Sequence, residues 1–205
     1  MMELFISAFA TLFVVIDPPG CAPIYYSLTT SASAAQRRAM AIRSVLIAAA
    51  VLLVFAFFGK ALLGALGISL DSFRVAGGIM LFIIALEMVF EKRTERREAR
   101  AEEVGHSEVE DVSVFPMAIP MIGGPGSIAS IMLLMSEAGS LTERGVVFAA
   151  LGLVLLLTLA ALLAAGPILR VLGNKMEAMI TRLLGVILAA LAAQYVIDGL
   201  AATFV

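Results

Sequence analysis

Long apolar stretches dominate the chain, and short polar stretches separate them. A helix needs about 20 predominantly apolar residues to cross the hydrocarbon core of a bilayer. Stretches of this kind predict six membrane-spanning segments. We place them at residues 3–31, 39–66, 71–91, 113–135, 145–169 and 178–204. The pattern therefore predicts an all-α membrane protein.

Prolines and glycines interrupt two of these segments. The first segment contains Asp17-Pro18-Pro19-Gly20, and the fourth contains Gly123-Gly124-Pro125-Gly126-Ser127. Proline loses nothing at the first position of a helix, and an Asp or Gly directly before it is a suitable cap. Each interrupted segment is therefore predicted to consist of two half-helices. Because non-helical backbone in a membrane must lie inside protein or beside water, we expect a polar site at the breaks.

The second half of the chain repeats the first. A shift of 106 residues carries Pro19-Gly20 onto Pro125-Gly126 and the second segment onto the fifth. A shift of 108 residues carries the Arg74-x-x-Gly77 pattern of the third segment onto Arg182-x-x-Gly185 of the sixth. Each copy crosses the membrane an odd number of times, so the second copy enters from the opposite side. We expect two inverted three-helix repeats, residues 1–91 and 113–205, with the first helix of each repeat broken.

Basic side chains are distributed unevenly between the loops. The first, third and fifth loops hold eleven Lys or Arg residues, and the other two loops hold only Lys60, Arg74 and Arg144. Cytoplasmic loops carry the excess of basic residues, which predicts that both termini lie outside the cell. The third loop, residues 92–112, is the most charged stretch, and we expect a charged cytoplasmic linker there.

The composition agrees with a membrane protein and excludes several other classes. Hydrophobic residues make up 61% of the 205 residues and charged residues 15%, whereas soluble domains have roughly 45–50% apolar residues. The net charge of −2 gives no basic patch for nucleic acid. The single Cys21 and the single His106 exclude an internal disulfide and a histidine metal cluster. We therefore expect no metal and no cofactor.

The inverted arrangement would bring the two breaks together near the middle of the bilayer. The second half-helix of each broken segment would run away from the middle, so the two N-termini would face each other. A helix N-terminus carries unpaired N–H groups and about half a positive charge, which suit a carboxylate. Asp17 would pair with an ammonium group on the same small zwitterion. The expected substrate-binding residues are Asp17, Pro19, Gly20, Gly123, Gly124, Pro125, Gly126 and Ser127.

Other interpretations of these residues stay open. One alternative is that Asp17 only caps a helix. Another is that the glycines only allow helices to pack closely. Asp17 and Glu87 are candidates to carry a coupling proton, since both are carboxylates expected inside the membrane. Sodium is the alternative coupling ion. The chain has no G-x-x-x-x-G-K-[ST] motif for binding ATP. Transport would therefore be driven by an ion gradient or by the concentration gradient of the substrate itself.

Two stretches of the chain resemble the signatures of a known family. The stretch from Ile16 through Asp17-Pro18-Pro19-Gly20 to Tyr25 resembles the first signature of the MarC family of bacterial and archaeal inner-membrane proteins. The stretch from Phe115 to Ile128 resembles the second. The likeness covers the whole chain in length and in its six-segment layout. It implies a place in the inner membrane and the transport of small neutral amino acids such as glycine and alanine.

These observations predict a secondary transporter that works by alternating access. An exporter of drugs or other metabolites on the same fold is the alternative. An enzyme is not expected, because a hydrolase would need a base beside Ser127 and His106 lies in the charged loop. The expected partners are the lipid bilayer and a small zwitterion. A homo-oligomer stays open, because lipid-facing and partner-facing apolar surfaces look alike in a sequence.

Overall fold

The computed structural model describes residues 1–92 and 111–204, and within those ranges it contains helices and their connections but no strand. The prediction of an all-α fold is confirmed. The elements are α1 (Met2–Ile16), α2 (Pro18–Leu28), α3 (Ala34–Ala65), α4 (Leu70–Val89), η1 (Ser113–Ile122), α6 (Pro125–Glu137), α7 (Leu141–Leu163) and α8 (Ala165–Phe204). Of the predicted linker at 92–112, residues 93–110 lie outside the described residues.

Five spans in the described residues are long and apolar enough to cross a membrane. They are Met2–Leu28, which joins α1 and α2, then α3, α4, α7, and Ala178–Thr203 within α8. A sixth span results when η1 and α6, which are bent by 51° at their junction, count as one. The six predicted segments therefore correspond to these spans. The prediction missed that α8 already begins at Ala165, directly after α7.

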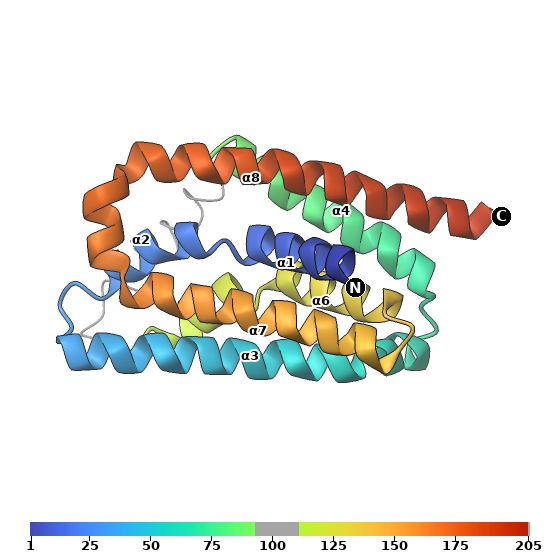
Figure 1. Cartoon of the computed structure of the whole chain (residues 1–205), viewed down its shortest axis with the longest axis horizontal. Coiled ribbons are helices and arrows are strands. Elements are labelled where there is room, and N and C mark those ends of the chain that lie inside the picture. Colours follow the sequence, from blue (N-terminus) through green and yellow to red (C-terminus); the bar gives the residue numbers. More distant parts are fainter. Residues whose placement is uncertain (93–110, 205) are drawn as a thin grey trace.

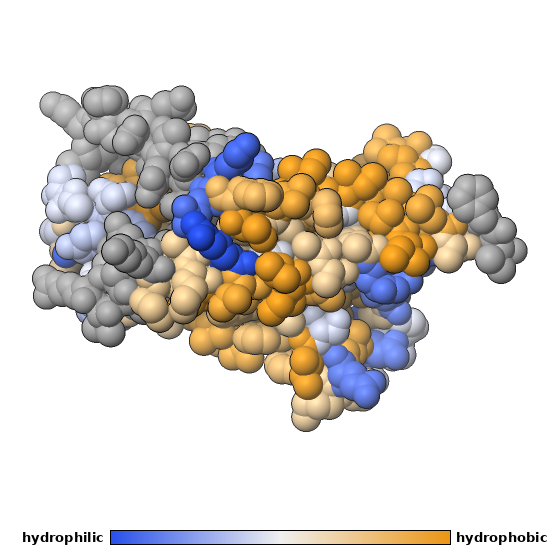
Figure 2. Space-filling view, turned by 90° about the horizontal axis from the view of Figure 1, so that it is seen from above, coloured by the Kyte–Doolittle hydropathy of each residue, from blue (hydrophilic) through white to orange (hydrophobic). Residues whose placement is uncertain are grey.

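The helices form three layers that share one long axis (Figure 1). α3 and α7 lie in one outer layer, α4 and α8 in the other, and α1, α2 and α6 between them. Both termini lie toward the same end of the bundle, which we call the terminal end. Figure 2 looks onto the layer of α4 and α8 and shows apolar side chains over much of this face. Exposed Phe82, Ile83, Leu183 and Val186 belong to these two helices and suit contact with lipid.

Serine caps fix where three of the long helices begin. α3 and α7 start with the same capping box, in which Ser33 pairs with Gln36 and Ser140 pairs with Glu143. In each box the serine hydroxyl accepts from the backbone of the third helical residue, whose own side chain accepts from the serine backbone. Ser69 caps α4 through its hydroxyl. The corresponding helices α3 and α7 thus begin in the same way.

The contacts between helices occur in corresponding pairs. α1 packs on α7, as η1 packs on α3. α2 packs on α7 and α8, as α6 packs on α3 and α4. Exchanging α1 and α2 for η1 and α6, α3 for α7, and α4 for α8 leaves this set of contacts unchanged.

Glycines bring α4 and α8 into close contact along their length. A Cβ atom at Gly78 would lie 2.8 Å from the Ala192 carbonyl oxygen, and one at Gly185 would lie 3.1 Å from the Ala85 carbonyl oxygen. Small residues let two membrane helices approach with their backbones almost touching, which increases van der Waals contact. These glycines are therefore packing residues.

The first half of the fourth span is less regular than predicted. Within η1, Phe115 and Ile119 have extended backbone angles, and each precedes a proline, Pro116 or Pro120. The residue before a proline avoids the helical region, and the proline itself lacks an N–H. The break expected at 123–126 therefore extends through η1, which differs in this respect from the regular α1.

Candidate functional site

Asp17 forms the break between α1 and α2, and only 1% of its surface is exposed. Its backbone has left-handed angles, φ 58° and ψ 65°, which an Asp tolerates better than most residues. The Asp17 N–H donates to the Phe13 carbonyl at the end of α1, and the Asp17 carbonyl accepts from the Cys21 N–H in α2. One residue thus ends one helix and begins the next.

Gly20 allows the Asp17 carboxylate to cap α2. The Gly20 N–H donates to Asp17 Oδ1 at 3.1 Å. A Cβ atom at position 20 would lie 2.2 Å from Asp17 Oδ2, which is far inside van der Waals contact. Pro18 and Pro19 fill the first two helical positions and have no N–H to satisfy.

The N-terminus of α2 therefore does not offer the unpaired amide groups that we expected from the sequence. Its first two residues are prolines, the Gly20 N–H is bound to the Asp17 side chain, and the Cys21 N–H is bound to the Asp17 carbonyl. The chemical group that this break contributes is a buried carboxylate.

Two glycines shape the second break. A Cβ atom at Gly124 would lie 2.1 Å from the Pro120 carbonyl oxygen, so no other residue fits this turn. A Cβ atom at Gly123 would lie 3.3 Å from the Ala118 carbonyl oxygen of η1 and 3.5 Å from Ala48 Cα of α3. Chain path and packing account for both glycines, and their contact with a substrate stays a prediction.

The N-terminus of α6 keeps the donors that α2 lacks. No side chain caps this helix, and Pro125 at its first position has no N–H. The N–H groups of Gly126 and Ser127 have no hydrogen bond to another described residue. Ser127, with 2% of its surface exposed, adds a buried hydroxyl. This end of α6 has the amide donors and the partial positive charge that suit an anion.

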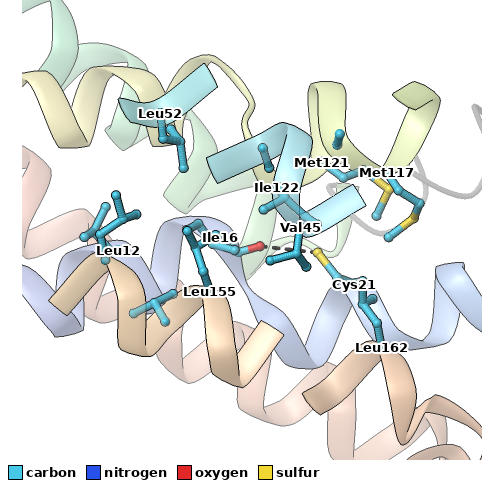
Figure 3. Packing of buried hydrophobic residues seen from close by; sticks show 14 of the residues in the cluster. Leu12, Ile16, Cys21, Val45, Leu52, Met117, Met121, Ile122, Leu155 and Leu162 are labelled. Atoms are coloured by element: carbon cyan, nitrogen blue, oxygen red, sulfur yellow. Dashed lines mark hydrogen bonds between the residues drawn. The ribbon is translucent and has the colours of Figure 1, made fainter. Parts of the chain in front are cut away.

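The two breaks are neighbours in the middle of the bundle. A Cβ atom at Gly126 would lie 3.2 Å from Val15 Cγ1, two residues before Asp17. Figure 3 shows Ile16 and Ile122, which directly precede the breaks, in one packed cluster. α2 and α6 start at about the same level along the bundle and run in opposite directions (Figure 1). The break that carries the buried carboxylate therefore lies beside the break that carries the amide donors.

The site is closed in this structure. Six of the eight predicted substrate-binding residues are buried. Pro19 is half-buried and Pro125 is exposed. Ionisable residues inside membrane-spanning segments are rare, so the buried Asp17 is a candidate functional residue.

Glu87 lies on α4, close to the second break. It follows Ile84 by one turn, and a Cβ atom at Gly126 would lie 2.5 Å from Ile84 Cδ1. Glu87 is half-buried. Its part in proton coupling stays a prediction. Among the described residues, no three His, Cys, Asp or Glu side chains come together in a way that would hold a metal ion.

The sequence did not single out Ser130 of α6 and Tyr195 of α8 as functional residues, although both are buried. Ser130 follows Ser127 by one helical turn, so the spacing alone would have placed both on one face of a helix. Tyr195 lies in an apolar stretch that looks like a lipid-facing helix. No pattern in the sequence indicates that its side chain is buried between helices. Arg74, near the start of α4, bonds to Asp71 in the first turn of the same helix at 3.1 Å.

Comparison with known proteins agrees with the signatures at the two breaks. The sequence model of MarC family integral membrane proteins matches residues 2–204. The chain belongs to the MarC family. It is an integral membrane protein, and both breaks lie within the part that the MarC model covers.

Relatives of this MarC protein occur in archaea and bacteria. A UPF0056 membrane protein of Methanocaldococcus jannaschii is 37% identical over 199 residues, which cover 97% of each chain. A UPF0056 membrane protein of Archaeoglobus fulgidus is 35% identical over 98% of this chain and 93% of its own. The UPF0056 inner membrane protein YhgN of Escherichia coli is 35% identical over 97% of each chain. No solved structure matches the chain with significance.

Proposed function

We propose that this MarC protein is a secondary transporter of small neutral amino acids of the glycine and alanine type. The substrate binds between the two helix breaks. Its ammonium group pairs with the Asp17 carboxylate, and its carboxylate accepts from the amide groups of Gly126 and Ser127. The Ser127 hydroxyl supplies a further donor.

One observation carries this proposal. The first break, which holds a buried carboxylate, lies beside the second break, which holds a helix N-terminus with two unpaired amide groups. A negative and a positive site on neighbouring segments suit a molecule that carries an ammonium and a carboxylate group on the same carbon. In a low-dielectric interior each charge costs much less when its partner is present, so a zwitterion is favoured over a singly charged solute.

The corresponding helix contacts support alternating access by two inverted repeats. The close contacts of α4 and α8 are reciprocal, since Gly78 approaches Ala192 as Gly185 approaches Ala85. Under the shift of 108 residues, Gly185 corresponds to Gly77, the neighbour of Gly78. Repeats related in this way can exchange conformations, which opens a central site first to one side and then to the other.

Several finer features belong to the same proposal. The relative YhgN is named an inner membrane protein, and we propose the inner membrane for this chain, with both termini outside. Transport uses a proton or sodium gradient, with Asp17 and Glu87 as proton carriers in the first case. The direction of transport depends on the gradients.

Uptake of labelled glycine and alanine into proteoliposomes tests the proposal. Asp17→Asn keeps an oxygen for the Gly20 N–H but removes the charge, so we expect initial uptake to fall about tenfold or more. Glu3→Gln is the matched control, because it removes an exposed acid from the same helix, and it should leave uptake unchanged. Equal uptake by Asp17→Asn and the unaltered protein would refute the assigned role of the carboxylate.

The same liposomes separate this function from export of drugs or other metabolites. The site is enclosed by buried side chains, and a small substrate fits such a place best. We expect unlabelled alanine to compete with labelled glycine and bulky antibiotics to have no effect. Transport of an antibiotic that alanine does not inhibit would favour the exporter instead.

A further inference from the structure

Two buried hydroxyl groups lie between the second break and the terminal end of the bundle. Thr11 of α1 and Ser130 of α6 are both 0% exposed. Neither hydroxyl makes a regular hydrogen bond to another described residue. Buried polar groups are almost always hydrogen-bonded, and an unsatisfied one is costly, so these two call for a partner such as water or a polar solute.

The register of α1 against α6 places these hydroxyls at the same level. The two helices pack on each other and run in opposite directions (Figure 1). Gly126 of α6 approaches Val15 of α1. Thr11 lies one turn from Val15, and Ser130 lies one turn from Gly126, both toward the terminal end. Since residues four apart share a helix face, Thr11 and Ser130 belong to the same contact as Val15 and Gly126.

Tyr195 of α8 extends this row. It is 8% exposed and packs in one cluster with Val15 of α1 and Leu133 of α6. Its hydroxyl lies close to that of Thr11. Three buried hydroxyl groups from three helices therefore occur in the same part of an otherwise apolar contact.

Charged side chains close the terminal end of the row. Arg74 of α4 bonds to Asp71 of its own helix at 3.1 Å, and its Nε lies 3.7 Å from Glu137 Oε1 of α6. The Arg74 side chain is 20% exposed and that of Glu137 is 34% exposed, so the pair stands at the boundary between the buried row and water.

We infer that this row is the route by which a polar solute travels between the central site and the terminal side of the membrane, with Arg74 and Glu137 as its gate. The inference rests on the proposed function. The hydroxyls of Thr11, Ser130 and Tyr195 replace water around the solute along the route. The gate opens when α6 moves from α4, which separates Arg74 from Glu137, while Asp71 stays with Arg74 on the same helix.

Cysteine labelling tests this route without a transport assay. Cys21 is fully buried and is replaced by Ser, and single cysteines are then introduced as Thr11→Cys, Ser130→Cys or Ala8→Cys. Ala8 is the matched control because it is also 0% exposed and lies nearer the terminal end of α1, but faces an apolar cluster. A charged, membrane-impermeant methanethiosulfonate is added on the terminal side, and the rate of modification is measured.

We expect Thr11→Cys and Ser130→Cys to react about tenfold faster than Ala8→Cys, since a thiol must be reached by water to react. Adding Glu137→Gln weakens the gate and should increase both rates further. Equal rates at Thr11→Cys and Ala8→Cys would overturn the inference. So would an absence of reaction at both Thr11→Cys and Ser130→Cys with Glu137→Gln present, once circular dichroism shows that these variants are folded.

The labelling and transport results together show whether the inferred route or the proposed substrate is wrong. If Thr11→Cys reacts but amino acids are not transported, the route stands and the proposed substrate is wrong. If amino acids are transported while neither introduced cysteine reacts, the solute passes elsewhere and the inference is wrong.

Discussion

At the scale of single residues, Asp17 has two tasks that sequence alone could not separate. Its oxygen caps α2 through the Gly20 N–H at 3.1 Å, and its charge stands next to the second break. The sequence allowed both a helix cap and a substrate ligand at this position. The structure shows the helix cap. The proposed function assigns a second role to the same buried carboxylate, which is to bind the ammonium group of the substrate.

Gly20→Ala tests whether the fold depends on the close contact between position 20 and the Asp17 carboxylate. The added methyl would meet Asp17 Oδ2 at 2.2 Å, so the carboxylate must leave the Gly20 N–H. Losing a hydrogen bond to a charged group costs about 1.5–3 kcal/mol, and we expect a lower unfolding temperature by circular dichroism. Gly64→Ala, at a helical position with nothing within 4 Å, should leave the temperature unchanged or raise it. Equal effects of both changes would show that the close contact is unimportant.

At the scale of helices, the two broken spans are less alike than their sequences suggest. The paired Pro-Gly motifs located both breaks correctly. They did not reveal that the Asp17 side chain and carbonyl occupy the free amides of α2 while α6 keeps two unpaired amide groups. That difference depends on which backbone group each side chain reaches, and hydrophobic patterns carry no information about it. The irregular η1, in contrast, follows from prolines that were visible in the sequence.

Gly78→Ala tests the contact between α4 and α8. The new Cβ would lie 2.8 Å from the Ala192 carbonyl oxygen, so the backbones must separate. Overpacking of this kind costs about 1–3 kcal/mol, and the unfolding temperature in detergent should fall. Gly145→Ala on α7 has nothing within 4 Å and is the control. A stable Gly78→Ala protein would mean that α4 and α8 can move apart easily.

At the scale of the whole molecule, apolar stretches predicted the all-α fold and the positions of six spans. Both termini lie toward one end, as an even number of crossings requires. The three-layer arrangement could not be predicted in the same way, because apolar helices that face lipid and apolar helices that face each other have similar sequences. Glycine contacts and buried hydroxyls, which only a structure shows, make this distinction.

The central claim is that the two breaks together bind a solute that carries an ammonium and a carboxylate group on the same carbon. Isothermal titration of the purified protein with alanine, propionate and ethylamine tests it most directly, because the two analogues each keep one of the charges. The account predicts that alanine binds at least about tenfold more tightly than either analogue, a difference of about 1.4 kcal/mol. It also predicts that Asp17→Asn removes the advantage over propionate. Binding of propionate or ethylamine as tight as that of alanine would contradict the claim.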